Sequence, residues 1–480
     1  MKFKEALTFD DVLLAPQFSE VEPKNVNLKT LLTPNIPLSI PLISAAMDTI
    51  TEASTAVSLA RQGGIGVIHK NMAIEKQAQE VKKVKKAESG IIVDPITIDP
   101  EDTISEIKKL IKDYNISGLP VVKGNELMGL VTKRDIAFAD NSSTAKEVMT
   151  KELITVNSGI PTQEAKQILH QNRIEKLLVT DQNNVLQGLI TKRDLDKLEE
   201  FPLATKDDHQ RLRVAAAIGT GENTNERARA LVQAGVDVLV IDSAHADSRN
   251  IHETIKKIKR EYKDIDVIAG NIATPGAAQR LIDLGVDAIK IGIGPGSTCT
   301  TRIVAGIGVP QITAIMECSQ VAKQSGVTVI ADGGIRYSGD IVKSLAAGAD
   351  AVMIGNLFAG TEETPGGIIH YRGRKYKTYR GMGSVEAMEE GSSDRYFQNN
   401  NSSKFVPEGI GAMAPYRGPL KETVFQLVGG IQSGMGYTGS SNIKELQKNA
   451  EFLRVTSAGI KESHPHNITI TKEAPNYQVE

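Results

Sequence analysis

The sequence has little of three things: cysteine, excess charge of one sign, and long apolar runs. Two cysteines among 480 residues are too few for a disulfide framework. The 56 basic and 58 acidic residues nearly cancel, and no run of Lys or Arg marks a surface for nucleic acid or an anionic membrane. No stretch approaches the ~18 consecutive apolar residues of a membrane span, and the first residues lack the apolar core of a secretory signal. We therefore expect a cytoplasmic protein with small-molecule partners and with neither nucleic acid nor membrane among them.

The chain is too long for one core, because single cores stop growing near ~250–300 residues. From Arg213 onward, six short runs rich in Val, Ile and Ala alternate with amphipathic segments, a pattern typical of buried parallel strands in βα units. Two more such runs, "IPLISAAMD" and "GGIGVIHKN", lie near the N-terminus. Together they supply the eight strands of a (β/α)8 TIM barrel. A doubly wound open sheet is the rival fold, disfavoured because no G-x-G-x-x-G follows a first strand.

Residues 89–205 separate the second βα unit from the third, so we expect an inserted domain there and a catalytic barrel made of 1–88 and 206–480. The insertion repeats itself, because "NELMGLVTKRDI" recurs as "NVLQGLITKRDL" in copies of about 92–148 and 151–205. Each copy predicts a β-α-β-β-α unit. The shared Thr-Lys-Arg-Asp signature fits a helix start with Thr as N-cap, and it also fits a nucleotide site at a strand end.

One cysteine lies in a loop where a structural role is hard to explain. The 292–302 loop, "GIGPGSTCTTR", surrounds Cys299 with glycines and hydroxyl side chains. Cys318, in "QITAIMECSQVAKQ", has the apolar neighbours of a core thiol. Because hydroxyl and amide donors favour the thiolate, we predict that Cys299 is a nucleophile. Metal binding is a weaker alternative, since the "HPH" at 464–466 is too short a pattern by itself.

The carboxyl ends of the strands, where barrel active sites gather, carry polar or glycine residues. These residues are Asp242, Asn271, the 292–302 loop, Asp332 with Gly333 and Gly334, and Gly355 with Asn356. Loops after the seventh and eighth strands often bind phosphate, because glycines let backbone amides approach the anion. "ADGGIR" and "MIGNLFAG" fit that role, and ordinary β-to-α turns are the alternative.

A long segment from about 381 to 411 lacks helical or strand periodicity and is rich in glycine and asparagine. Such length is unusual for a connection unless the segment has a function. Arg395 and Tyr396 stand together near its middle. We predict a mobile flap that brings this pair to the site after one reaction step, against the alternative of disorder without function.

Taken together, these motifs resemble the inosine 5′-monophosphate (IMP) dehydrogenase family over essentially the whole chain. The resemblance rests on "LTFDDVLLAP", "SAAMDTITEA", "GGIGVIHKNM", paired repeats that resemble CBS (Bateman) domains, "GIGPGSTCTTR", "ADGGIR", "YRGMGS", "RYF" and "VPEGI". It implies a TIM barrel with an inserted tandem CBS domain. The related GMP reductases resemble the barrel and its cysteine loop, but they normally lack the CBS insertion and differ at "YRGMGS" and the Arg–Tyr flap.

The resemblance implies NAD-dependent oxidation of IMP to XMP, the committed step of guanine nucleotide biosynthesis. Cys299 would attack C2 of the purine, leaving a covalent thioimidate after hydride transfer. Arg395 with Tyr396 would activate water, and Thr301 with Glu408 is a second route. The implied IMP contacts are Ser297, Asp332, Gly333, Gly334, Gly355, Asn356, Tyr379, Arg380, Gly381, Met382, Gly383 and Glu408. The implied NAD contacts are Asp242, Gly292, Ile293 and Gly294.

The family also implies a bound K⁺ and a homotetramer, possibly an octamer. The cation ligands would be Gly294, Gly296 and Cys299, with Glu462, Ser463 and His464 from an adjacent subunit. In this family the CBS pair binds adenine or guanine nucleotides in some members and does little in others. The sequence departs from common family patterns at Ala246 and Asp247, which leaves cofactor contacts beyond Asp242 open, and at Asn356.

Other functions remain possible at this stage. GMP reductase is the nearest enzyme, and a catalytically silent nucleotide-sensing CBS protein is the alternative from another class. A silent protein needs a broken site, whereas Cys299, Thr301, Arg395 and Tyr396 are all present. A flavin-dependent barrel oxidoreductase is disfavoured, because a flavin that takes the hydride makes the nucleophile and the lid superfluous.

Overall fold

The computed structural model describes residues 3–477 except 89–91, 94, 115, 125, 158–159, 193–194, 197–199 and 399–403. It divides the chain into two compact units. The first contains residues 1–85, 203–205 and 212–480, and the second contains 86–202 and 206–211. The second unit therefore begins and ends about three residues before the insertion expected at 89–205, and a short return segment belongs to it.

Eight parallel strands close a barrel in the first unit, as the sequence predicts. Around the barrel they are β12 (Ala215–Ile218), β13 (Val238–Asp242), β14 (Asp266–Ile272), β15 (Ala288–Ile291), β16 (Thr328–Asp332), β17 (Ala351–Ile354), β4 (Leu42–Ser44) and β5 (Ile65–Ile68). All residues of β4, β5, β12 and β15 are buried, which explains their continuous apolar runs. The barrel therefore continues in space across the insertion.

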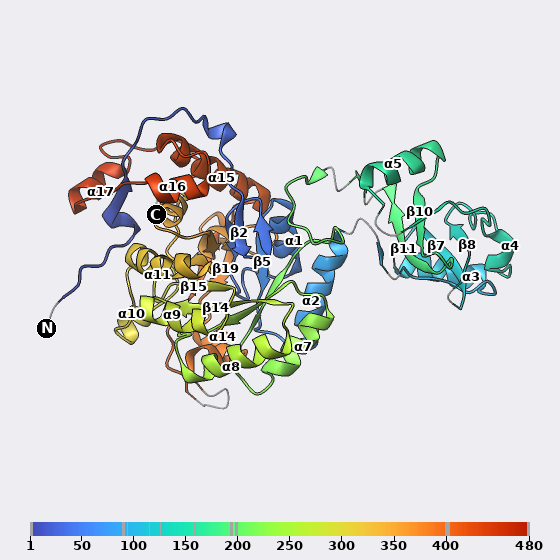
Figure 1. Ribbon diagram of the computed structural model, residues 1–480, viewed down its shortest axis with the longest axis horizontal. Helices are drawn as coiled ribbons and strands as arrows, with labels where there is room; N and C mark the ends of the chain where they lie inside the picture. The colour runs from blue at the N-terminus through green and yellow to red at the C-terminus, as the bar shows by residue number, and fades with distance from the viewer. Residues whose placement is uncertain are drawn as a thin grey trace. The chain divides into compact units, whose positions relative to one another are not determined.

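Helices cover the outside of the barrel (Figure 1). They are α1 (Ala53–Arg61), α2 (Ile74–Ala87), α7 (Thr224–Gln233), α8 (Arg249–Glu261), α9 (Pro275–Asp283), α10 (Thr301–Val304), α11 (Gln311–Ser325), α12 (Ser338–Ala346) and α13 (Asn356–Ala359). The longer helices bury one face against the barrel. In α8, for example, Ile251, Ile255 and Ile258 are buried at i, i+4 and i+7, while the charged residues face outward.

A hairpin closes the amino end of the barrel. Strands β2 (Thr30–Thr33) and β3 (Ile36–Leu38) insert Leu32, Ile36 and Leu38 into the core cluster formed by the inward-facing strand residues. The Thr328 hydroxyl, at the start of β16, donates to the Leu32 carbonyl at 2.6 Å. Because this end is sealed, a site at the barrel axis can form only at the carboxyl ends of the strands.

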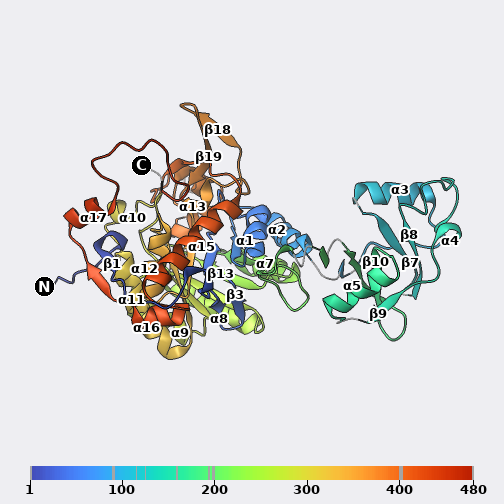
Figure 2. The same ribbon diagram turned by 90° about the horizontal axis from the view of Figure 1, so that it is seen from above.

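The rest of the first unit surrounds that open end or packs outside the barrel. Figure 2 shows the β18–β19 hairpin extending away from the barrel. These elements are η1 (Phe9–Asp11), β1 (Val12–Leu14), η2 (Pro23–Asn25), β18 (Ile368–Tyr371), β19 (Arg374–Arg380), α14 (Val385–Glu389), η3 (Ser392–Tyr396), β20 (Gly411–Pro415), α15 (Leu420–Tyr437), α16 (Ile443–Asn449), β21 (Phe452–Arg454) and α17 (Ser457–Ser463). Strand β19 pairs with β18 and with β20.

The second unit contains the two repeats. Its elements are β6 (Ile92–Val93), α3 (Ile104–Asp113), β7 (Gly118–Lys123), β8 (Glu126–Thr132), α4 (Ala145–Val148), β9 (Thr155–Asn157), α5 (Thr162–Gln171), β10 (Lys176–Thr180) and β11 (Leu186–Thr191). Each repeat has its own buried cluster, and β6 of the first repeat pairs with β11 of the second. The repeats therefore share a sheet.

The repeated signature does not start a helix in its first copy. Thr132 ends β8, and both its amide and its hydroxyl donate to the Asp135 carboxylate at 2.7 Å within a turn. Arg193 and Asp194 of the second copy lie outside the described residues. Within the described part of the chain, no helix is long and apolar enough to cross a membrane.

Candidate active site

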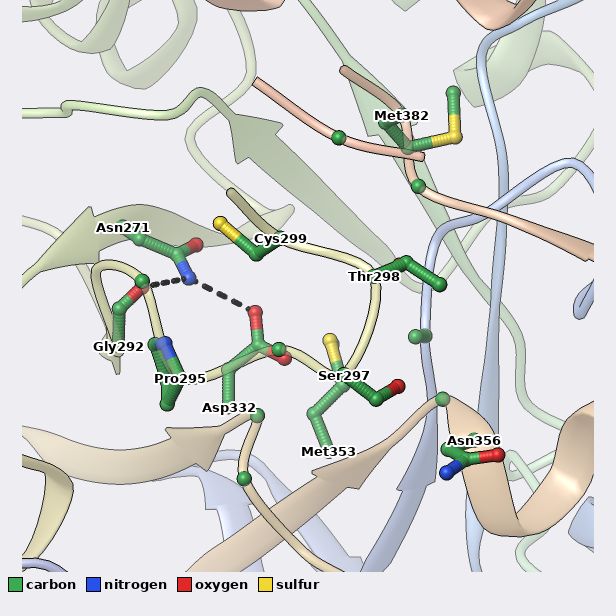
Figure 3. A pocket seen from close by; sticks show the side chains of 18 of the residues that line it. Asn271, Gly292, Pro295, Ser297, Thr298, Cys299, Asp332, Met353, Asn356 and Met382 are labelled. Carbon is green, nitrogen blue, oxygen red and sulfur yellow. Dashed lines mark hydrogen bonds between the residues drawn. The ribbon is translucent and has the colours of Figure 1, made fainter. Parts of the chain in front are cut away.

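A cavity of about 300 Å³ opens at the carboxyl ends of the barrel strands. Its walls come from the loops after β4, β15, β16 and β17, from the ends of β13 and β14, and from the 379–409 segment. Figure 3 shows labelled side chains from these separate loops converging on one space. The ring of polar strand ends predicted from the sequence therefore exists.

Of the two thiols, only Cys299 lies on the cavity. It is partly exposed, and its Sγ donates to the Thr301 hydroxyl at 3.2 Å. Cys318 is fully buried in α11, and burial raises the pKa of its thiol to about 12. The expectation that Cys318 is a core residue is thus confirmed. No cluster of three or more His, Cys, Asp or Glu side chains suited to a metal occurs among the residues described.

A buried lysine joins two acidic residues at the carboxyl ends of the barrel strands. Lys290 in β15 has a side chain only 1 % exposed, and its Nζ lies 3.0 Å from Asp242 Oδ1 and 2.7 Å from Asp332 Oδ2. It also donates to Asn271 Oδ1, while Asn271 Nδ2 donates to Asp332 Oδ2 at 2.9 Å and to the Gly292 carbonyl at 2.7 Å (Figure 3). Lys290 therefore fixes the spacing of the two carboxylates. Sequence reasoning missed it, although a lysine inside the apolar run "AIKIGIG" was a usable signal.

Replacing Lys290 by Met should destabilise the barrel strongly. The carboxylates of Asp242 and Asp332, 6 % and 20 % exposed, would then lose their shared cation inside the protein. Removing one member of a buried charge group costs about 3–5 kcal/mol of unfolding free energy. The matched control is Lys259→Met, which removes a more exposed ion pair to Asp287 and should cost at most about 1 kcal/mol. Urea unfolding would measure both variants, and equal losses would contradict the role given to Lys290.

Glycine turns and hydroxyl groups line the opposite wall. Gly333 and Gly334 follow β16 with φ of +92° and +83°, a backbone that side chains rarely adopt. Two consecutive turns of this kind present backbone amides to a neighbouring anion. The Tyr379 hydroxyl lies 3.1 Å from Ser297 Oγ, and burial raises the pKa of Tyr379. This wall combines anion-binding backbone with neutral hydrogen-bonding groups.

The described residues of the 381–411 segment, called the flap below, lie closed over the site. Arg395 forms an ion pair with Asp242, and its carbonyl accepts the Ala244 amide at 3.1 Å. The Tyr396 ring lies so close to Gly383 that an added Cβ there would come within 2.7 Å of it. The sequence of the flap lacks helical periodicity, yet part of the flap is helical. Its described residues form the short helices α14 and η3, too brief to give a clear periodic signal.

Most predicted site residues line the cavity. Those that do are Asp242, Gly292, Gly294, Gly296, Ser297, Cys299, Asp332, Gly333, Gly334, Gly355, Asn356, Tyr379, Gly381, Met382, Arg395, Tyr396 and Glu408. Ile293 and Thr301 stand in the same loop behind it, and Gly383 supports Tyr396. The Arg380 side chain points elsewhere, because its Nη2 pairs with Asp48 at 2.7 Å and with Glu390 at 2.5 Å. The exposed residues 462–464 lie outside the cavity.

The two unusual residues after β13 also have structural partners. Asp247 accepts from Arg280 Nε at 2.8 Å and lies 3.3 Å from His252 Nε2. The Ala246 amide donates to the Asn271 carbonyl at 2.8 Å, and the residue is fully buried. Neither lines the cavity. These two substitutions therefore leave the thiol and its neighbours unchanged.

The arrangement suits attack on an electrophilic carbon of a substrate that the site binds through an anionic group. The predicted nucleophile, Cys299, shares the cavity with Asp242 and Asp332, whose carboxylates can accept hydrogen bonds from hydroxyl groups, and with the glycine turn at 333–334. The closed flap adds Arg395 and Tyr396 to the same space. Burial raises the pKa of Tyr396, so this phenol is neutral and can pass a hydrogen bond. A covalent step followed by a water-dependent step is the chemistry that these groups can support.

Comparison with known proteins agrees with this chemistry. Residues 6–466 match the family model "IMP dehydrogenase / GMP reductase domain". Inosine-5'-monophosphate dehydrogenases of Aquifex aeolicus and Bacillus subtilis are 56% and 53% identical to this chain. The matches cover 100% and 99% of this chain, and 99% and 98% of the relatives. The corresponding enzyme of Helicobacter pylori is 56% identical over 99% of both chains.

A solved structure of a GMP reductase also resembles this chain over nearly its whole length. A cysteine-to-alanine variant of Trypanosoma brucei GMP reductase, in complex with guanosine 5'-monophosphate, has a TM-score of 0.88 and 40% identity to this chain. The match covers 97% of this chain and 99% of the other. So little is left uncovered that the match must include the insertion. The insertion by itself therefore does not exclude a GMP reductase.

Proposed function

Because this chain belongs to the IMP dehydrogenase / GMP reductase family, we propose that it oxidises IMP to XMP with NAD⁺ as hydride acceptor. The observation that carries the proposal is the meeting of Cys299 with Arg395 and Tyr396 on one cavity. When the flap closes, Arg395 and Tyr396 would promote hydrolysis of the covalent intermediate. Full-length identity of 53–56% to relatives named IMP dehydrogenase supports the same choice.

The substrate would bind by its phosphate and ribose. Asp332 lies at the end of β16, where its second carboxylate oxygen can accept from the ribose hydroxyls. The amides of Gly333, Gly334 and Gly355 would receive the phosphate, with Asn356 as an added donor. Ser297 and Tyr379 would border the purine, together with the remaining implied contacts. This order of groups would direct C2 of the ring toward the cysteine loop.

In the first half-reaction, the Cys299 thiolate adds to C2 and the C2–H bond breaks with both electrons leaving as hydride. NAD⁺, when bound, supplies the acceptor for that hydride. Thr301 holds the sulfur through its hydroxyl at 3.2 Å. The nicotinamide end would be held by Asp242, Gly292, Ile293 and Gly294. In the closed flap, Arg395 forms an ion pair with Asp242 at the same place. The flap and the dinucleotide therefore compete for one place.

In the second half-reaction, water adds to C2 and the sulfur leaves as the thiol, giving XMP. The closed flap would bring Arg395 and Tyr396 to that water, and Thr301 with Glu408 is the second route. The second route is compatible with the closed flap, because the Thr300 amide donates to the Glu408 carbonyl at 2.9 Å and so joins Glu408 to the cysteine loop beside Thr301. Arginine is almost always protonated, so the first route needs a relay through a neutral partner such as Tyr396.

A monovalent cation fits the cysteine loop. The Gly296 carbonyl accepts the Cys299 amide at 3.0 Å, whereas no amide in the described residues donates to the carbonyls of Gly294 or Cys299. Free carbonyl oxygens suit a hard cation such as K⁺. We propose that 462–464 of an adjacent subunit complete the ligand set, which makes a homotetramer the working form. Bound K⁺ would hold the loop in one conformation.

Replacing K⁺ by Li⁺ at equal ionic strength should slow the reaction about tenfold or more. A smaller ion cannot contact all the carbonyls, and a loop displacement of about 1 Å can cost about 100-fold in rate. Steady-state NADH formation with saturating IMP and NAD⁺ is the measurement. Replacing Na⁺ by Li⁺ in a K⁺-containing buffer is the control. An unchanged rate in Li⁺ alone would rule out the proposed cation.

One assay distinguishes the candidate activities. Purified protein with IMP, NAD⁺ and K⁺ should form NADH, and protein with GMP and NADPH should leave both unchanged. The reverse result would identify a GMP reductase, and no turnover in either assay would favour a nucleotide-sensing protein. The second unit is the candidate site for adenine or guanine nucleotides, and its ligand can be sought by calorimetry on the full chain.

A further inference from the structure

A buried lysine outside the catalytic cavity holds the flap. Lys70 lies two residues after the end of β5, and its Nζ forms an ion pair with Asp394 of η3. The two side chains are 9% and 24% exposed. Lys70 does not line the catalytic cavity. Among the described residues, the one side-chain hydrogen bond of Lys70 goes to the flap.

Asp394 immediately precedes Arg395, so the contact with Lys70 acts on the reactive pair. Arg395 forms its own ion pair with Asp242 at the end of β13. Two consecutive flap residues are thus bound to two different parts of the barrel, the loop after β5 and the end of β13. The orientation of the backbone between them is fixed by both pairs, and the Ala244 amide adds a bond of 3.1 Å to the Arg395 carbonyl.

The barrel is shaped to accept Asp394. At Gly219, an added Cβ would overlap the Asp394 Oδ2 and would lie 3.2 Å from Lys70 Nζ. Any larger residue would push the carboxylate out of its place. Beside this contact, Asn71 Nδ2 donates to the Ala387 carbonyl of α14 at 3.4 Å and to Asp48 at 2.7 Å. The loop after β5 therefore supports the flap at two separate points.

The ion pair exists only when the flap is closed. An open flap takes Asp394 away and leaves a largely buried ammonium group without its partner, which is unfavourable. An interaction present in one of two states shifts their equilibrium by its own free energy. Burial lowers the pKa of Lys70, and Asp394 opposes that effect. The charged form of Lys70 is therefore stabilised in the closed state, where Asp394 is beside it.

We propose that Lys70 is a positioning residue that holds the flap closed through Asp394 and so favours hydrolysis of the covalent intermediate. The proposal rests on the proposed function for its kinetic consequence. Because the flap and the dinucleotide compete for the place at Asp242, loss of Lys70 would also strengthen binding of the dinucleotide to the intermediate. The coupling is reciprocal, so the two effects should be of equal size.

The test is Lys70→Met in the full-length protein. First-turnover NADH formation should stay within about twofold of the parent, while steady-state turnover should fall about tenfold, the size of effect typical of such couplings. Inhibition by high NAD⁺ should tighten by a similar factor. Lys70→Arg should restore most of the turnover, and Asp394→Asn should reproduce the loss. Because the pair is shared, combining Lys70→Met with Asp394→Asn should add little further loss.

Two further variants guard against a general effect on folding. Lys76→Met removes an exposed lysine of α2, paired with Glu52 at 3.3 Å, and should change neither half-reaction. Gly219→Ala should weaken closure by filling the place of the Asp394 carboxylate, without touching a charge. If Lys70→Met fails to fold, Gly219→Ala and Asp394→Asn carry the test.

Trypsin provides a readout that needs no substrate. The Arg395 side chain is 14% exposed in the closed flap, so cleavage after it should be about tenfold faster in Lys70→Met than in the parent. Cleavage after the exposed Lys472, outside the flap, serves as the internal reference. Unchanged cleavage together with an unchanged ratio of turnover to first-turnover rate would overturn the proposal, as would equal loss of both half-reactions. Absence of NADH formation in the parent would refute the proposed function, and the cleavage result would still decide the role of Lys70.

Discussion

Cys299→Ala is expected to abolish NADH formation from IMP and NAD⁺, including the first turnover. Without the sulfur, no covalent bond forms at C2, and the hydride has no reason to leave a stable aromatic ring. Removing a nucleophile of this kind costs at least about 1,000-fold in rate. The side chain is partly exposed and makes a single hydrogen bond to Thr301, so its removal should leave the barrel folded. Rapid-mixing absorbance of NADH is the measurement.

The matched control for that loss is Cys318→Ala. Cys318 is the other thiol, fully buried and far from ionisation with a pKa of about 12. Its replacement removes one core sulfur and should cost stability without stopping the first turnover. Intact mass after acid quenching should show a nucleotide adduct on the parent and on Cys318→Ala, and none on Cys299→Ala. An adduct that survives in Cys299→Ala would place the covalent bond elsewhere and remove the basis of the mechanism.

Much of the fold could be predicted from the sequence, because it depends on local pattern. The eight barrel strands are buried on both faces, so each reads as a continuous apolar run, even with an insertion between the second and third. The turn at Gly333 and Gly334 could be predicted because the ability to adopt positive φ belongs to glycine itself. The nucleophile was visible because Cys299 lacks apolar neighbours.

Contacts between distant segments could not be predicted in the same way. Lys290 and its partners, Asp242 and Asp332, meet only because three strands are adjacent in the barrel. Lys70 and Asp394 are separated by 324 residues, and nothing near either one indicates the other. The short helices of the flap depend on packing against the barrel rather than on their own periodicity. Such features are tertiary, and they are also the ones that adjust the chemistry.

Arg395→Ala is expected to separate the two half-reactions. The variant should form NADH in the first turnover, since Arg395 stands in the flap and not on the cysteine loop. It should then stall on the covalent adduct, with steady-state turnover lower by about 100- to 10,000-fold, the contribution typical of a positioned proton-transfer group. Accumulation of the adduct, followed by intact mass, is the measurement. Arg374→Ala, an exposed position on β19, is the control and should match the parent in both phases.

The size of the loss shows which function of Arg395 matters. Arg395 pairs with Asp242 and, in the proposed mechanism, also activates the attacking water, so its removal should weaken flap closure as well as hydrolysis. Lys70→Met weakens closure alone and keeps the guanidinium, so it measures the closure component by itself. If Arg395→Ala is slower than Lys70→Met by tenfold or more, the guanidinium takes part in activating water. If both variants lose turnover equally, Arg395 acts only as a latch, and Thr301 with Glu408 would carry the proton transfer. Equal loss of the first turnover in Arg395→Ala and Cys299→Ala would contradict the division of labour between loop and flap.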